Sequence, residues 1–300
     1  MRPAIEVRAL RKAFGRQIVL DDLDLRVHQG EVFALLGPNG AGKTTTINVL
    51  TTLTKPDAGS ATVAGIDVVR HPEKVTQRIS LTGQAAAVDD VLTGTENLMM
   101  LGRLSGLSGS RAKARAGELL DRFGLTDAAG KRVGAYSGGM RRRLDLALSF
   151  VVTPEILFLD EPTTGLDTRS RRELWDVIRS LAEAGTTVFL TTQYLEEADQ
   201  LADRIAVLDS GRIVALGTAN ELKGRVGGDT VELHDEHGGL VREVPTDGSV
   251  SDLRRALDIL DESGARGMVT LRRPSLDDVF LALTSPETRT AASVPLKEIA

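Results

Sequence analysis

EVFALLGPNGAGKTT, residues 31–45, decides the fold of this 300-residue chain. The short apolar run at 32–36 predicts a buried strand, and a helix-length segment follows from Lys43 to about Leu53. Between them, the sequence matches G-x-x-x-x-G-K-S/T at every fixed position. A strand, a glycine-rich loop and a helix in this order are typical of a phosphate-binding loop. The residues of the predicted loop are Gly37, Pro38, Asn39, Gly40, Ala41, Gly42, Lys43, Thr44 and Thr45.

The loop offers several contacts to phosphate groups. Its glycines let the backbone curl tightly and leave N–H groups open to an anion. The N-terminus of the following helix adds partial positive charge. We expect Lys43 to reach the β- and γ-phosphates of a nucleotide and the Thr44 hydroxyl to bind Mg²⁺. The alternative interpretation is a plain glycine-rich turn between a strand and a helix.

The composition limits the function classes. The chain is 41% hydrophobic and 26% charged, as in ordinary globular proteins, and its net charge of −5 argues against duplex nucleic acid as the main partner. It has no cysteine, so disulfides, thiol metal sites and a cysteine nucleophile are excluded. The N-terminal residues lack the apolar core of a signal peptide. No apolar run approaches the ~18 residues that span a bilayer, so we expect any membrane role to depend on a partner chain.

A second strand, ILFLDEP at 156–162, ends in two acids. Carboxylates are costly where an apolar strand leaves the core unless a cation or a reaction uses them. We expect Asp160 to hold Mg²⁺ and Glu161 to activate the water that attacks a γ-phosphate. The alternative is a pair of exposed acids at a strand end.

Polar residues also mark the ends of other predicted strands. Gln84 follows the strand at 79–82, and Gln193 follows the strand at 187–190. Ligands of open α/β sheets bind at the carboxyl ends of the strands. Phe14 lies near the turn of a predicted hairpin, where it either stacks on an adenine or belongs to the core.

The region 91–151 interrupts the alternation of strands and helices and is predicted to be mostly helical. Within it, Ser137 is a natural N-cap, and Gly138 and Gly139 leave bare N–H groups at a helix start. This is a second candidate anion site. The alternative is a simple helix cap.

The predicted fold is α/β, with a P-loop NTPase core, an antiparallel β-subdomain and a helical insertion. We place the ATPase domain at 1–220, with the helical subdomain at about 87–151. A small α+β module follows at 221–300, and its last fifteen residues are expected to be frayed. In this module His234 and His237 lie near acids, where a solvated turn is favoured over a metal site.

Together these motifs resemble the nucleotide-binding subunit of an ABC transporter over residues 1 to about 220. GPNGAGKTT is similar to the Walker A loop of that family, ILFLDEP to its Walker B strand with the catalytic glutamate, and YSGGM to its LSGGQ signature. The departures in the signature are Tyr136 and Met140. The resemblance gives Phe14 the aromatic A-loop position and Gln84 the Q-loop position, as a nucleotide contact and Mg²⁺ ligand beside Thr44 and Asp160. It also assigns Gly165-Leu166-Asp167 to the D-loop, with Asp167 at the nucleotide.

The family usually has a histidine where this chain has Gln193. An amide can hydrogen-bond a γ-phosphate but cannot carry a proton, so Glu161 is left as the base, supported by Lys43 and Gln193. The segments TTQYLEEADQLADRI and PSLDDVFLALT resemble the daunorubicin-resistance type of exporter ATPase. In that subgroup the ATP-binding chain is separate and docks on an integral-membrane chain.

The resemblance implies a homodimer with ATP and Mg²⁺, because Ser137, Gly138 and Gly139 of one subunit face the γ-phosphate held by the other. We therefore expect an ATPase that powers export of a hydrophobic drug, antibiotic or lipid. Its expected location is cytoplasmic, on the inner face of the cell membrane. One alternative is a soluble ABC-type ATPase acting on ribosomes or nucleic acid. The other is a nucleotide-gated regulatory module with little turnover, prompted by Gln193 and Met140.

Overall fold

The computed structural model describes residues 3–83, 88–262 and 267–284. The chain divides into two compact units, Met1–Leu216 and Gly217–Ala300. Within the described ranges, none of the helices combines the length and the apolar character needed to span a membrane.

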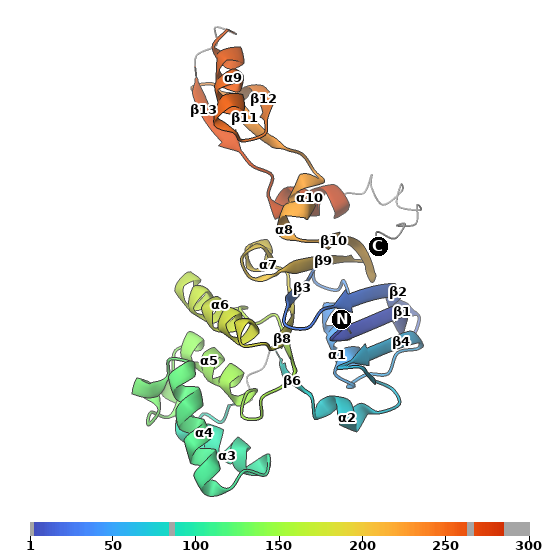
Figure 1. Cartoon of the computed structure of the whole chain (residues 1–300), viewed down its shortest axis with the longest axis vertical. Helices are drawn as coiled ribbons and strands as arrows, with labels where there is room; N and C mark the ends of the chain where they lie inside the picture. Colours follow the sequence, from blue (N-terminus) through green and yellow to red (C-terminus); the bar gives the residue numbers. More distant parts are fainter. Residues whose placement is uncertain (1–2, 84–87, 263–266, 285–300) are drawn as a thin grey trace. The chain divides into compact units, whose positions relative to one another are not determined.

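A six-stranded sheet forms the centre of the first unit (Figure 1). Its order is β10-β9-β3-β8-β7-β6, and the pairs among β9, β3, β8, β7 and β6 are all parallel. β3 and β7 are buried along their whole length because they consist of continuous apolar runs covered on both faces. The strands are β3 (Val32–Leu36), β6 (Ile79–Thr82), β7 (Ile156–Asp160), β8 (Thr187–Thr192), β9 (Arg204–Asp209) and β10 (Arg212–Gly217).

A second, antiparallel sheet has the order β2-β1-β4-β5. Helix α1 contacts strands of both sheets, and Figure 1 shows it on the opposite side of the central sheet from α6 and α7. Alternate residues of β1 and β2 face a buried core that includes Phe33, Phe158 and Phe189 of the central sheet. The elements are β1 (Ile5–Phe14), β2 (Gln17–Val27), α1 (Lys43–Leu50), β4 (Ala58–Val63), β5 (Ile66–Asp67), α2 (Pro72–Thr76), α6 (Thr168–Glu183) and α7 (Leu195–Leu201).

The predicted helical insertion consists of α3 (Gly94–Leu104), α4 (Gly109–Arg122) and α5 (Gly138–Leu148). Thr93 caps α3 in a capping box with Glu96. The α/β fold with its antiparallel subdomain and helical insertion is thus confirmed. α1 is shorter than expected and ends at Leu50, where Thr51 and Thr52 close the helix with turn hydrogen bonds to Ile47 and Val49.

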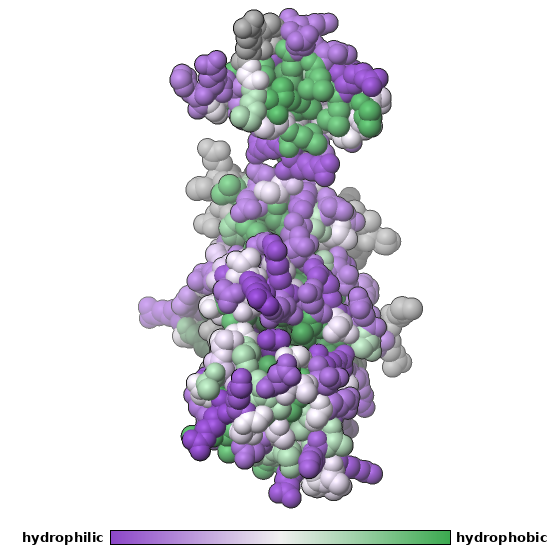
Figure 2. Space-filling view, turned by 90° about the vertical axis from the view of Figure 1, so that its left-hand side faces the viewer, coloured by the Kyte–Doolittle hydropathy of each residue, from purple (hydrophilic) through white to green (hydrophobic). Residues whose placement is uncertain are grey.

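The second unit contains a three-stranded antiparallel sheet, β12-β11-β13, against which α9 packs. Its small core joins Val231 and Leu233 of β11 to Ala256 and Leu260 of α9. Figure 2 shows a hydrophobic patch on this unit, and exposed apolar side chains of β13 include Met268 and Leu271. The elements are α8 (Ala219–Gly224), β11 (Asp229–His234), β12 (Leu240–Thr246), α9 (Val250–Asp261), β13 (Met268–Arg272) and α10 (Leu276–Thr284).

α8 was not predicted from the sequence. The overlooked signal is a capping box between Thr218 and Glu221, which begins this helix. His234 contacts Glu232 at 3.0 Å, and the described residues contain no cluster of three metal-ligating side chains. The predicted frayed tail lies outside the described residues.

Candidate functional site

Three predicted motifs meet at one edge of the central sheet because β3, β7 and β8 are parallel neighbours. Leu36 pairs with Thr192, and Asp160 pairs with Thr191. The glycine-rich loop, the Asp160–Glu161 pair and the segment after β8 therefore emerge side by side at the carboxyl ends of the strands. Residues more than 100 positions apart in the sequence form one site.

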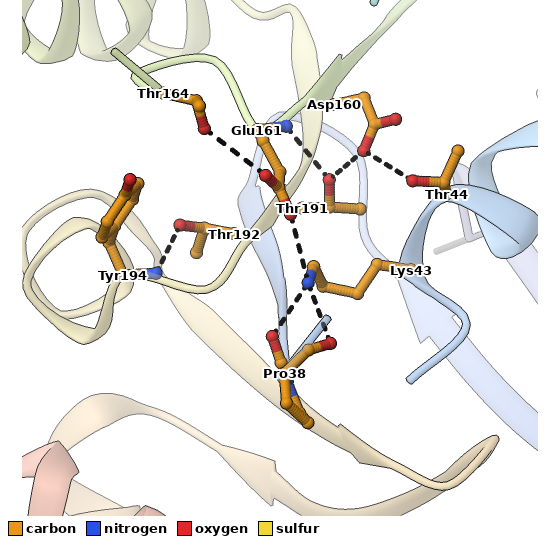
Figure 3. Close-up of polar contacts among 10 residues, drawn as sticks. Pro38, Lys43, Thr44, Asp160, Glu161, Thr164, Thr191, Thr192 and Tyr194 are labelled. Atoms are coloured by element: carbon orange, nitrogen blue, oxygen red, sulfur yellow. Dashed lines mark hydrogen bonds and ion pairs between the residues drawn. The ribbon is translucent and has the colours of Figure 1, made fainter. Parts of the chain in front are cut away.

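Lys43 lies at the centre of this site (Figure 3). It is buried, and its Nζ donates hydrogen bonds to the carbonyls of Gly37 at 2.9 Å and Pro38 at 3.1 Å. The same ammonium lies 3.2 Å from Oε1 of Glu161, whose side chain is also buried. The loop carbonyls and the carboxylate hold the positive charge beside the loop, where a phosphate group would contact it.

The conformation of the loop explains two of its glycines. Gly42 has φ +111°, a left-handed conformation that favours glycine. A side chain at Gly37 would run into the carbonyl oxygen of Leu208. The first amide hydrogen bond of α1 runs from Thr46 to the Gly42 carbonyl, so the N–H groups of the preceding residues have no partner within the helix. These N–H groups and the helix N-terminus can bind phosphate.

Asp160 and Thr44 face each other beside the loop, with Thr44 Oγ1 3.4 Å from Asp160 Oδ1. Thr191 Oγ1 donates a hydrogen bond of 2.6 Å to the same carboxylate oxygen and thereby fixes its orientation. A hydroxyl and a carboxylate oxygen are hard donors of the kind that Mg²⁺ prefers, and the ion also uses substrate phosphates as ligands. These two residues fit the predicted Mg²⁺ site. Gln84, the third predicted ligand, lies outside the described residues.

Glu161 adopts a backbone conformation that is unusual for a residue with a side chain. Its φ is +48°, and its N–H donates to both the carbonyl and the hydroxyl of Thr191. Thr164 Oγ1 lies 3.4 Å from Glu161 Oε2, opposite the contact with Lys43. Strain of this kind concentrates at functional sites, because the surrounding structure must hold it in place. The strained backbone thus places the carboxylate beside Lys43, the cation of the phosphate loop.

The predicted second anion site is the start of α5. Ser137 caps this helix, accepting a hydrogen bond from the Met140 N–H, and both Ser137 and Gly138 are exposed. Gly139 is buried against Ser170, whose N–H and hydroxyl both donate to the Asp167 carboxylate. These hydrogen bonds lower the pKa of Asp167, which serves as the N-cap of α6. The signature and the D-loop of one chain are therefore packed together.

None of the hydrogen bonds or ion pairs among the described residues joins the start of α5 to the chain's own phosphate loop. The departure at Tyr136 has a structural explanation, because its hydroxyl donates a 2.8 Å hydrogen bond to the Ala128 carbonyl in the helical insertion. Burial raises the pKa of Tyr136, which keeps the hydroxyl protonated as a donor.

Phe14 and Gln193, two further predicted site residues, lie on other elements. Phe14 is the last residue of β1 and is 54% exposed, and Lys12 Nζ lies 5.3 Å from its ring centroid. A core position for this ring is therefore wrong, and an exposed aromatic face is open to stacking. Gln193 follows β8 and is partly buried, and within the described ranges its amide has no hydrogen-bond partner.

Two residues that support the site were not predicted from the sequence. Thr191 holds both Asp160 and Glu161, and its signal was a hydroxyl at the carboxyl end of a buried strand. Glu197 of α7 is almost completely buried and accepts a hydrogen bond from Trp175 Nε1 at 3.3 Å. Burial raises the pKa of this carboxyl, while Thr192, Thr163, Trp175 and Arg171 oppose the shift.

Comparisons with known proteins agree with this geometry. A family model described as ABC transporter matches residues 20–164. The daunorubicin resistance ATP-binding protein DrrA2 of Streptomyces coeruleorubidus is 52% identical over 310 residues, covering 95% of this chain and 96% of the relative. The daunorubicin/doxorubicin resistance ATP-binding protein DrrA of Streptomyces peucetius is 51% identical, covering 94% of this chain and 92% of the relative.

A solved structure of an ATP-binding subunit of an ABC transporter superposes with a TM-score of 0.65 and 28% identity, covering 74% of this chain and 92% of that chain. The resemblance predicted from the sequence is thereby confirmed, including its daunorubicin-resistance subgroup. The phosphate loop, the acidic pair after β7 and these relatives lead to one assignment: the chain belongs to the ABC transporter family, as one of its ATP-binding ATPase subunits.

Proposed function

We propose that this chain hydrolyses ATP as a homodimer and thereby drives export of a hydrophobic small molecule through a separate integral-membrane subunit. The observation that carries the proposal is the group formed by Lys43, Asp160 and Glu161 at the carboxyl edge of the central sheet. This group combines a buried cation for phosphates, a carboxylate suited to Mg²⁺ and a strained acid suited to act as a base.

Each residue has a distinct role in the proposed reaction. Lys43 and the loop N–H groups bind the β- and γ-phosphates. They stabilise the negative charge that develops as the bond between these two phosphates breaks. Thr44 and Asp160 would hold Mg²⁺, and the bound ion would neutralise part of the negative charge of the phosphates. Glu161 accepts a proton from the attacking water, and the Gln193 amide donates to the γ-phosphate.

The proposed dimer is supported by the exposed start of α5. Ser137 and Gly138 present a hydroxyl and bare N–H groups to solvent, although they belong to the family signature. A second copy, related by two-fold symmetry, would place its own phosphate loop against them and complete two equivalent sites. ATP would then hold the two copies together, and its hydrolysis would release them.

A groove on the helical insertion supports the proposed membrane partner. It has a volume of about 300 Å³ and lies between the end of β6, α3 and the region of α5. Its lining includes Leu81, Leu101, Leu148 and Val152, and the side chains of Leu81 and Val152 are exposed. The lining also contains Ser105, Asp145 and Ser149, and a groove with both apolar and polar side chains suits a short amphipathic helix of a partner chain. We propose that the membrane subunit docks here, which makes the chain a peripheral subunit at the inner membrane face.

The proposed cargo class rests on the relatives, whose names refer to resistance against daunorubicin and doxorubicin. A hydrophobic drug, antibiotic or lipid is the corresponding class for this chain.

Glu161→Gln tests the proposal directly. It keeps the volume of the side chain and removes the base, so we expect ATP turnover to fall by about 10²–10⁴-fold while MgATP binding persists. The variant should then form a stable dimer with MgATP in analytical ultracentrifugation. Glu155→Gln is the matched control, because Glu155 is an exposed acid just before β7 and should leave turnover unchanged. Wild-type turnover in Glu161→Gln, or a monomer with bound MgATP, would contradict the proposal.

A further inference from the structure

Arg142 of α5 is a buried cation that none of the expected motifs uses. Its side chain is only 11% exposed, although it lies between two other arginines in the sequence. Burial lowers its pKa, whereas the negative charges of Asp145, Glu197 and Asp160 act in the opposite direction. A buried guanidinium without good partners would be strongly destabilising, so its contacts identify what this residue holds.

The guanidinium joins three segments of the first unit. Nε donates to the Pro162 carbonyl at 2.8 Å, and Nη1 donates to the Gly83 carbonyl at 2.7 Å. Nη1 also contacts Asp145 Oδ2 at 3.1 Å, one turn further along α5. Pro162 directly follows Glu161, and Gly83 directly follows β6. The helix capped by Ser137 is thus tied both to the loop that follows Glu161 and to the end of β6.

The same contacts reach the groove described above. Gly83 and Asp145 both contribute to the lining of that groove. The Nη2 group of Arg142 is buried and, among the described residues, has no hydrogen-bond partner. The guanidinium therefore connects two residues that line the groove with Pro162.

We propose that Arg142 is a positioning residue that couples the groove and the signature helix to Glu161 of the same chain. This inference rests on the proposed function and deepens it. Displacement of Gly83 or α5 by a docked partner or a second copy would move the Pro162 carbonyl through the rigid fork. Hydrolysis, rather than nucleotide binding, would therefore depend on Arg142, because none of its hydrogen bonds or ion pairs to described residues involves the phosphate loop.

Arg142→Lys tests the coupling, because lysine keeps the positive charge but cannot direct donors along the divergent lines of a guanidinium. Arg115→Lys is the matched control. Arg115 of α4 also uses its fork within the helical insertion, where it contacts the Phe150 carbonyl, Thr153 and Glu118, but it touches neither Gly83 nor Pro162. Each variant loses an arginine that donates from more than one nitrogen. We would compare the stabilities of the two variants by thermal unfolding.

We expect Arg142→Lys to lower kcat by about 100-fold, because small misplacements of a catalytic group have effects of this size, with KM for ATP within about twofold of wild type. Arg115→Lys should retain kcat. Unchanged kcat in Arg142→Lys, or equal losses of kcat in the two lysine variants, would overturn the inference.

The failure of the proposed function gives a different result. If the proposed function is wrong, the wild type shows no ATP turnover and Glu161→Gln does not dimerise with MgATP. The coupling inference then fails together with the proposed function. If those two proteins behave as proposed and Arg142→Lys behaves like Arg115→Lys, only the coupling is wrong.

Discussion

The contact between Gly139 and Ser170 provides a quantitative test of how the signature is packed. A Cβ atom added to Gly139 would lie 2.5 Å from Ser170 Oγ and 2.8 Å from Ser170 Cβ. The hydroxyl can rotate only by giving up its 2.8 Å hydrogen bond to Asp167, and the Cβ contact persists in every rotamer. α5 and α6 must therefore move apart in Gly139→Ala.

Overpacking of this kind costs about 1–3 kcal/mol. Gly138→Ala is the matched control on the same helix, because a Cβ there would meet only Leu166 Cδ2, at an ordinary 3.8 Å. Its effect should stay within about 0.5 kcal/mol. With a urea dependence of roughly 2 kcal/mol per molar, Gly139→Ala should lower the unfolding midpoint by roughly 1 M.

The assay is urea unfolding followed by the fluorescence of Trp175, the only tryptophan of the chain, which is buried on α6, the helix that carries Ser170. Ser170→Gly removes both clashing atoms, so the double variant should recover part of the loss relative to Ser170→Gly alone. Equal midpoints for Gly138→Ala and Gly139→Ala would refute the described packing of the signature on the D-loop helix.

Two further predictions concern single side chains. Burial raises the pKa of Glu197 above its ordinary 4.5, so the folded chain binds a proton at this carboxyl more tightly than the unfolded chain does. The stability of the fold therefore falls as the pH rises from the pKa of the unfolded chain to the higher pKa of the folded chain. Glu197→Gln should therefore raise the urea midpoint more at about pH 8 than at about pH 5, and a pH-independent effect would contradict this account. Phe14→Ala should weaken ATP binding by about tenfold in a fluorescent-nucleotide displacement assay, since base stacking is worth roughly 1–3 kcal/mol. Phe14→Tyr should bind normally, and equal affinities for all three proteins would exclude stacking.

Most of the fold could be predicted from local patterns. The run Val32–Leu36 became β3 with the predicted bounds, because a continuous apolar segment flanked by glycine and polar residues has few alternatives. The phosphate loop was equally predictable, since its chemistry needs specific residues at fixed local spacing. α8 was missed because its capping box is short and the helix it begins has only six residues.

The supporting contacts of the site were less accessible to sequence reasoning. Thr191 lies about thirty residues after Asp160, and only the parallel register of β7 and β8 brings its hydroxyl to both acids. Likewise, Trp175 and Glu197 lie on different helices, and nothing local indicates that the carboxyl is buried.

By itself, the sequence determined which residues can bind phosphate, hold Mg²⁺ and act as a base, because those properties follow from side-chain chemistry and short spacings. Only the tertiary structure decided which contacts residues of the same type make. Arg141, Arg142 and Arg143 are consecutive in the sequence, yet Arg141 pairs with Asp90 and Arg143 contacts Glu173, while only Arg142 donates to the Pro162 carbonyl. The physical reason is that successive residues of a helix point in directions about 100° apart, so their environments depend on what packs against each side of α5.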